Sequence, residues 1–112
     1  MLFDDVGFGD FGCYGSTIDT LAAKGLRFTG FHTTAMCSTT RAALLTGRNH
    51  HTGGMGCLAN FDSGYPGYRG KIAREAGTLA EMLRPHGYRN YMVGKWHVTP
   101  LRESGPAGPV DG

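Results

Sequence analysis

Residues 37–48 read CSTTRAALLTGR, and this stretch predicts how the surrounding chain is arranged. A sulfur, three hydroxyls and an arginine come first, and the apolar residues after Arg41 are strong helix formers. We expect a helix that begins near Ser38 or Thr39, where a hydroxyl caps free backbone N–H groups, and that ends at Gly47. The start of such a helix carries partial positive charge, which favours anions.

Cys37 and Arg41 lie four residues apart in this pattern, so both side chains return to one face of the helix. The cysteine sulfur is potentially nucleophilic, and Arg41 offers a planar, permanently charged guanidinium to an oxyanion. A buried cysteine before an ordinary capped helix explains the same residues, because free cysteine is among the most buried residue types. Both interpretations stay open on these residues alone.

The composition is that of a globular protein with one modest core, since 40% of the 112 residues are hydrophobic and 11% are aromatic. The net charge of +2 comes from scattered basic side chains, which argues against nucleic acid as a partner. Three cysteines without a C-x-x-C pair argue against a disulfide framework. No run approaches the roughly 18 apolar residues of a membrane span, and the acidic start MLFDDV is unlike a signal peptide. We therefore expect no membrane partner and leave the compartment open, with the cytoplasm preferred.

Strand and helix patterns alternate along the chain. Residues 26–33 and 88–98 resemble strands. Helical patterns occur at 17–24 and, after a capping box, at 78–84. Residues 49–71 hold no period and are rich in Gly, Tyr and Asn, which predicts a long surface loop that is a candidate for function. Strands separated by helices are typical of an α/β fold.

Two further pairs of residues are candidates for a site. Asp4 and Asp5 end the first apolar segment, and adjacent carboxylates are either solvated turn residues or ligands of a hard cation. Lys95 and His97 lie two apart on a predicted strand and share a face, with Trp96 on the other. A cation beside an imidazole predicts an anion site, and a polar edge of the sheet is the alternative.

These stretches, taken in order, resemble the sulfatase family. Asp4 and Asp5 with the following Gly-Phe-Gly-Asp match its first motif, the 37–48 stretch matches its C-x-P-x-R and Leu-x-Thr-Gly-Arg signature, and Gly-Lys-Trp-His at 94–97 matches letter for letter. The resemblance implies that residues 1–112 are the N-terminal portion of a sulfatase catalytic domain, truncated at both ends. It implies an α/β fold of the alkaline-phosphatase type, a mixed sheet flanked by helices and here incomplete, with 49–71 as a long loop on the active-site side.

In that family the signature cysteine is oxidised to formylglycine by a formylglycine-generating enzyme, and its hydrated aldehyde attacks the sulfur of a sulfate ester. By resemblance, the nucleophile position and the groups that contact sulfate and aldehyde oxygens are Cys37, Arg41, Lys95 and His97. By the same resemblance, Ca²⁺ or Mg²⁺ is coordinated by Asp4, Asp5 and the modified Cys37. Thr39 stands where the family pattern has proline, a residue that the modifying enzyme recognises.

The function that the resemblance implies is hydrolysis of a small-molecule sulfate ester by an arylsulfatase-like enzyme. Family members carry further metal and catalytic residues later in the chain, so we expect little or no turnover from these 112 residues alone. A phosphoesterase or phosphonate hydrolase of the same superfamily is one alternative. A non-catalytic remnant that binds anions is the other.

Overall fold

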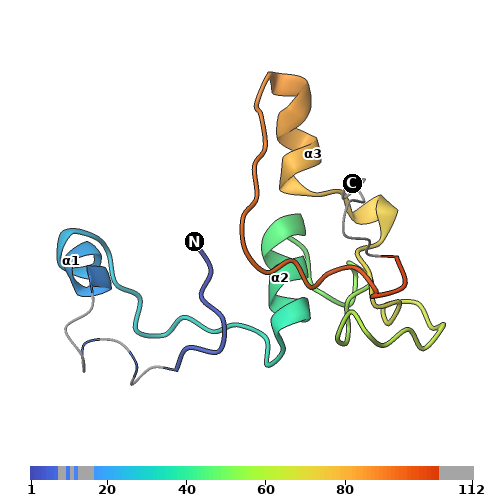
Figure 1. Ribbon diagram of the computed structural model, residues 1–112, viewed down its shortest axis with the longest axis horizontal. Helices are drawn as coiled ribbons and strands as arrows, with labels where there is room; N and C mark the ends of the chain where they lie inside the picture. The colour runs from blue at the N-terminus through green and yellow to red at the C-terminus, as the bar shows by residue number, and fades with distance from the viewer. Residues whose placement is uncertain (8–9, 11, 13–16, 104–112) are drawn as a thin grey trace. The chain divides into compact units, whose positions relative to one another are not determined.

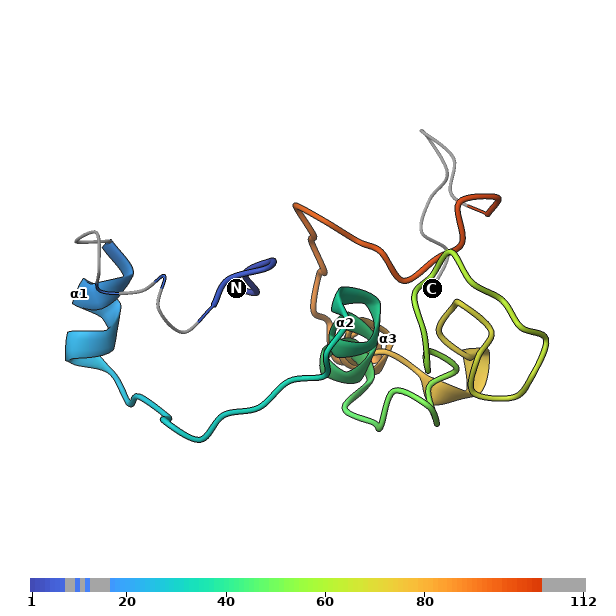
Figure 2. The same ribbon diagram turned by 90° about the horizontal axis from the view of Figure 1, so that it is seen from below.

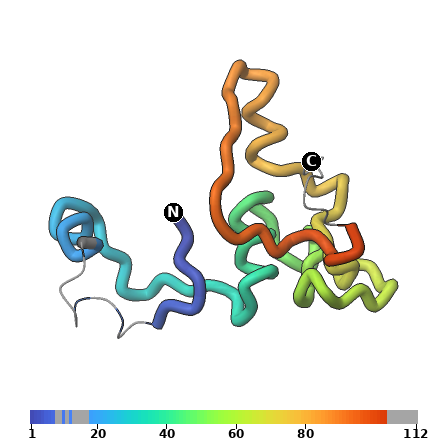
Figure 3. Tube along the Cα trace, in the orientation of Figure 1, coloured from blue at the N-terminus to red at the C-terminus, as the bar shows by residue number. Residues whose placement is uncertain are grey.

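The computed structural model describes residues 1–7, 10, 12 and 17–103. The chain divides into two compact units, Met1–Thr33 and Thr34–Gly112. Figures 1 and 3 trace the first unit in blue to cyan and the second from there to red. Residues 8 and 9 of the predicted Gly-Phe-Gly-Asp loop lie outside the described residues, as does the Pro- and Gly-rich tail from residue 104.

The first unit contains helix α1, Thr17–Lys24, as predicted. Asp19 in its first turn and Lys24 in its last turn have the charges that the helix dipole favours at each end. The chain leaves the helix at Gly25 and continues through residues 26–33, which are exposed.

The first helix of the second unit is α2, Cys37–Thr46. It starts one residue before Ser38, the nearer of the two predicted starts. The predicted hydroxyl cap is wrong, because the N-cap is Met36 and no side chain caps it. The Ser38 and Thr39 hydroxyls instead bond to other parts of the chain, and both residues are fully buried. The predicted C-cap is confirmed: Gly47 has φ 65° and its N–H bonds to a carbonyl of the last turn.

The helix predicted at 78–84 is observed as α3, Leu79–Leu83, followed directly by the 3-10 helix η3, Arg84–His86. Thr78 and Glu81 form the predicted capping box, each accepting the other's backbone N–H. Another 3-10 helix, η2 (Arg74–Ala76), precedes α3. Helix α3 contacts α2 next to the C-terminal end of α2 (Figure 1).

The core of the second unit is small and forms around α2. Its buried members are Ala42 of α2, Met55 and Ala59 of the 49–71 segment, and Val98 at the end of residues 88–98. Leu45, Ile72 and Trp96 pack against this cluster. Residues 49–71 contain neither a helix nor a named strand, and they are not wholly at the surface as expected, because Met55 and Ala59 are fully buried. This segment is therefore part of the packing that holds α2.

The predicted strands at 26–33 and 88–98 have no ladder in the part of the chain that the structure describes, where the β pairing is an isolated Met55–Tyr68 bridge. Residues 88–98 instead run back along α3 and past α2 as a single segment (Figures 1 and 2). A strand needs a neighbour that pairs with its backbone N–H and C=O groups. The mixed sheet therefore stays a prediction. No helix within residues 17–103 has the length and apolarity of a membrane span.

Candidate active site

Cys37 and His97 come together in the second unit although 60 residues separate them. The Cys37 Sγ lies 3.1 Å from His97 Nδ1, within hydrogen-bond distance for sulfur. Cys37 is the first residue of α2, and both side chains are half-buried. His97 has φ 55°, a left-handed conformation that is uncommon outside glycine and is often found at functional sites.

Arg41, one turn further along α2, holds the same segment. Its Nη1 donates to the backbone carbonyl of Lys95 at 2.5 Å, and Arg41 is only 9% exposed. The guanidinium therefore fixes the backbone of residues 94–97 over the first turn of α2. The two stretches that the sequence singled out separately thus form one cluster, with Cys37, Arg41, Lys95 and His97 as its members.

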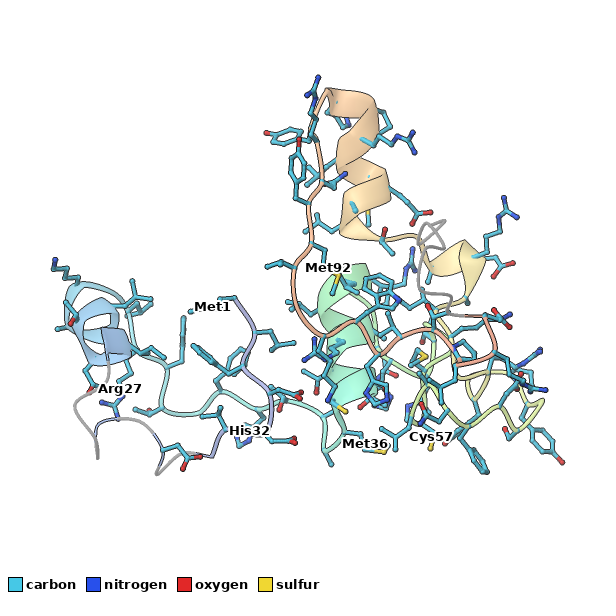
Figure 4. All side chains as sticks on the ribbon, viewed as in Figure 1. Met1, Arg27, His32, Met36, Cys57 and Met92 are labelled. Carbon is cyan, nitrogen blue, oxygen red and sulfur yellow. The ribbon has the colours of Figure 1, made fainter. Side chains whose placement is uncertain are left out.

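Hydroxyl groups hold the chain just before Cys37. The Thr34 hydroxyl lies 2.5 Å from that of Thr39 and 2.6 Å from that of Thr40. Thr39 also donates to the carbonyl of Met36 at 2.7 Å, and Met36 is labelled in Figure 4. The position at which the family pattern has proline is thus occupied by a buried hydroxyl that bonds to Thr34 and Met36, both of which precede Cys37. Sequence analysis missed Thr34, and no spacing signal in LRFTGFHTT identifies it.

The electrostatics of this cluster favour an anion. Helix α2 presents the positive end of its dipole at Cys37, and its first turn contains no acidic residue. Arg41 is permanently charged. Lys95, whose backbone carbonyl Arg41 binds, is exposed. The backbone N–H groups of the first turn of α2 and the Arg41 guanidinium together form a suitable environment for a tetrahedral oxyanion.

An open cleft of about 330 Å³ adjoins this cluster, and we call it the His97 cleft. It is lined by residues of the 94–97 motif, of the loop and of the following turn: Asn60, Lys95, Trp96, His97, Thr99 and Leu101. Asn60 and Leu101 were not singled out by the sequence, because neither belongs to a periodic pattern or a motif.

Asp4 and Asp5 belong to the first unit, whereas Cys37 belongs to the second. Both carboxylates are exposed, and Asp5 has φ 51°, a second left-handed residue outside glycine. Within residues 1–7, 10, 12 and 17–103, no three His, Cys, Asp or Glu side chains gather as a metal site would require. The metal site at Asp4, Asp5 and Cys37 therefore stays a prediction.

Comparison with known proteins defines the class to which this chain belongs. The family model described as Sulfatase matches residues 1–111. Human arylsulfatase A is 45% identical over 104 residues, which cover 85% of this chain and 19% of that protein. An uncharacterized sulfatase of Schizosaccharomyces pombe is 40% identical over 110 residues, covering 88% of this chain and 20% of that protein. The arylsulfatase of Klebsiella aerogenes is 33% identical over 105 residues, covering 88% of this chain and 23% of that protein.

The chain belongs to the sulfatase family. It spans about a fifth of the length of the curated relatives that it matches. Membership implies an α/β fold of the alkaline-phosphatase type, of which the described residues form helices α1, α2 and α3.

Proposed function

We propose that the cluster around Cys37 is the nucleophile and sulfate-binding part of a sulfuric ester hydrolase of the arylsulfatase type. The observation that carries this proposal is the 3.1 Å contact between Cys37 Sγ and His97 Nδ1, which joins the two sequence motifs. Family membership and the names of the arylsulfatase relatives support the reaction class. A small-molecule sulfate ester is the substrate class that we propose for the whole protein.

The roles that we propose follow from the chemistry of each side chain. Arg41 and Lys95 neutralise the charge of the sulfate oxygens, and the Arg41 guanidinium requires little reorganisation because it is already held by its bond to the Lys95 carbonyl. His97 lies beside the nucleophile position, where an imidazole can hold or move a proton. The N-terminal turn of α2 contributes its dipole.

Two groups that the family implies would complete this chemistry. A formylglycine at position 37, made by a formylglycine-generating enzyme, would supply a nucleophile with a route for releasing sulfate. The half-buried Cys37 at the positive end of α2 is compatible with such a group. The carboxylates of Asp4 and Asp5 have the chemistry for Ca²⁺ or Mg²⁺, but two adjacent residues supply few of the six to eight oxygens that Ca²⁺ takes.

Conversion of Cys37 is the first test of this proposal. The chain is co-expressed with a formylglycine-generating enzyme, and the peptide containing Cys37 is analysed by mass spectrometry. We expect the mass loss of the change from CH₂SH to CHO. A Thr39→Pro variant, which restores the family pattern near the start of α2, is expected to convert more completely. An intact thiol in both chains would contradict the proposal and support the non-catalytic remnant.

Hydrolysis is the second test. The converted chain is assayed with an aryl sulfate and with the matching aryl phosphate in the presence of calcium, with Cys37→Ala as the control. We propose that turnover by this chain alone is low, and that the remaining turnover is faster with the aryl sulfate than with the aryl phosphate. Turnover well above the Cys37→Ala control would overturn the expectation of low activity. A preference for phosphate would instead support a phosphoesterase or phosphonate hydrolase.

A further inference from the structure

We propose that Thr34 is a positioning residue for the nucleophile position. Its hydroxyl is the centre of a chain of hydrogen bonds that ends on the carbonyl of Met36 and fixes the peptide bond before Cys37. The inference rests on the proposed function, since it takes Cys37 as the nucleophile position. Thr34 lies three residues before Cys37 and belongs to none of the three motifs.

Three threonine hydroxyls meet at the start of α2 and make more contacts than they have protons. Thr34 Oγ1 lies 2.5 Å from Thr39 Oγ1, 2.6 Å from Thr40 Oγ1 and 3.2 Å from the Met36 carbonyl oxygen. Thr39 Oγ1 lies 2.7 Å from the same carbonyl oxygen, and Thr40 Oγ1 lies 3.1 Å from the Thr34 carbonyl oxygen. Each hydroxyl donates a single proton, so at most three of these five contacts are hydrogen bonds at one time.

The distances select one arrangement of the three protons. The three shortest contacts are all filled when Thr40 donates to Thr34, Thr34 donates to Thr39, and Thr39 donates to the Met36 carbonyl. Any other arrangement leaves two oxygens no more than 2.7 Å apart without a proton between them. We call the favoured arrangement the hydroxyl chain. Hydrogen bonds in such a chain polarise and strengthen one another, so removing Thr34 from its centre also weakens the bond at the carbonyl.

The hydroxyl chain ends at the peptide bond that joins Met36 to Cys37. The Met36 carbonyl accepts from the Thr39 hydroxyl at 2.7 Å and from the Thr40 backbone N–H at 3.1 Å. Because a peptide bond is planar, two bonds on this carbonyl also set the direction of the Cys37 N–H and the position of the Cys37 Cα. That N–H belongs to the first turn of α2, whose backbone donors have no partner within the helix and can bind an anion. The sulfur of the same residue lies 3.1 Å from His97 Nδ1.

Burial and the identity of residue 39 explain why this chain depends on Thr34. Thr39 is fully buried and Thr34 and Thr40 are half-buried, so water has limited access to their hydrogen bonds. The family pattern has proline at position 39, whose ring fixes the backbone without hydrogen bonds. Threonine occupies that position here, and the hydroxyl chain supplies the constraint in place of the ring.

NMR of the full chain with labelled histidine tests the positioning in Thr34→Val, which keeps the branched shape and removes the hydroxyl. We expect the His97 ring resonances to shift in the same direction as in Cys37→Ala, since both changes take the sulfur away from Nδ1. Thr34→Ser keeps the hydroxyl and should leave the His97 resonances in place. Thr46→Val is the matched control, because this buried hydroxyl donates to the Ala42 carbonyl at 2.7 Å at the other end of α2. Unmoved His97 resonances in Thr34→Val, or an equal shift in Thr46→Val, would overturn the inference.

Thr40→Val takes the place of Thr34→Val if the latter does not fold. It removes only the far end of the hydroxyl chain and keeps the two bonds nearest the Met36 carbonyl. We expect a smaller His97 shift in the same direction, because the remaining bonds lose part of their mutual polarisation. Absence of any shift would overturn the inference.

Calorimetric titration with sodium sulfate separates this inference from the proposed function. Thr34→Val should bind sulfate roughly two- to tenfold more weakly than the unaltered chain, because loss of a neutral hydrogen bond leaves the Cys37 N–H less ordered. Thr46→Val should bind as the unaltered chain does. Equal affinity in Thr34→Val and the unaltered chain would overturn the inference and leave the proposed function standing. Absence of sulfate binding by the unaltered chain would overturn the proposed function, and the His97 shift would then decide the inference alone.

Discussion

Replacing Arg41 by lysine separates the geometry of the site from its charge. The positive charge is kept, but the Nη1 hydrogen bond to the Lys95 carbonyl is lost together with the planar fork. A hydrogen bond that involves a charged group contributes about 1.5–3 kcal/mol. Lys95 is exposed, so water can take over its carbonyl and the cost should be near the lower value. About 1.5 kcal/mol corresponds to roughly tenfold weaker sulfate binding if residues 94–97 must be reordered when the anion binds.

The assay is calorimetric titration with sodium sulfate at constant, low ionic strength, because salt screens interactions between exposed charges. Arg48→Lys is the matched control: Arg48 follows α2 and its Nε donates to the backbone carbonyl of Ala76 at 2.9 Å, a similar bond remote from Cys37. We expect the control to bind sulfate as the unaltered chain does. Unchanged affinity in Arg41→Lys, or an equal decrease in both variants, would refute the reasoning.

Two further predictions concern the 49–71 loop. The backbone N–H of residue 64 and the side chain of Arg69 hold the pKa of Asp62 below its usual value of 3.8; this interaction stabilises the fold above the usual pKa and is lost as the pH falls through the lowered one. We expect an NMR titration to give a low pKa for Asp62 that rises part of the way to its usual value in Arg69→Ala, and an unaltered pKa would count against the contact. Gly54→Ala should lower the midpoint of thermal unfolding more than Gly87→Ala, because both have positive φ but only a Cβ at Gly54 meets a backbone oxygen, at 2.7 Å. Equal decreases would show that steric contact in the loop is unimportant.

The sequence predicted the local elements that depend on neighbouring residues. Helix α1, the Gly47 end of α2 and the capping box of α3 are all found, because helix formers, glycine and Thr-x-x-Glu act within a few residues. The start of α2 was predicted one residue late with the wrong cap. Ser38 and Thr39 are good capping residues in isolation, but the Ser38 hydroxyl accepts a tertiary bond from the Ala59 N–H and the Thr39 hydroxyl donates to the carbonyl of the N-cap residue Met36.

Long-range contacts were predictable only where a family motif gave them. Cys37, Arg41, Lys95 and His97 were expected in one site from the resemblance. Cys37 Sγ lies near His97 Nδ1 and Arg41 binds the Lys95 carbonyl, while the roles of the four side chains stay a prediction. The burial of Met55 was not expected, since a glycine-rich stretch without a period gives no sign that one of its side chains completes the core. The position of Asn60 in the His97 cleft follows from the same packing of the loop on α2.

The central claim is that Cys37 and His97 belong to one sulfate-binding site, and NMR of the chain with labelled histidine tests it most directly. Sulfate is added to the labelled chain, and the ring resonances of His97 and His51 are followed. We expect His97 to shift saturably with sulfate and to shift also in Cys37→Ala, because its Nδ1 loses the sulfur. His51, which lies 3.1 Å from the Tyr68 hydroxyl in the loop, should move in neither experiment. A His97 resonance insensitive to both changes, or one that moves no more than His51, would contradict the claim.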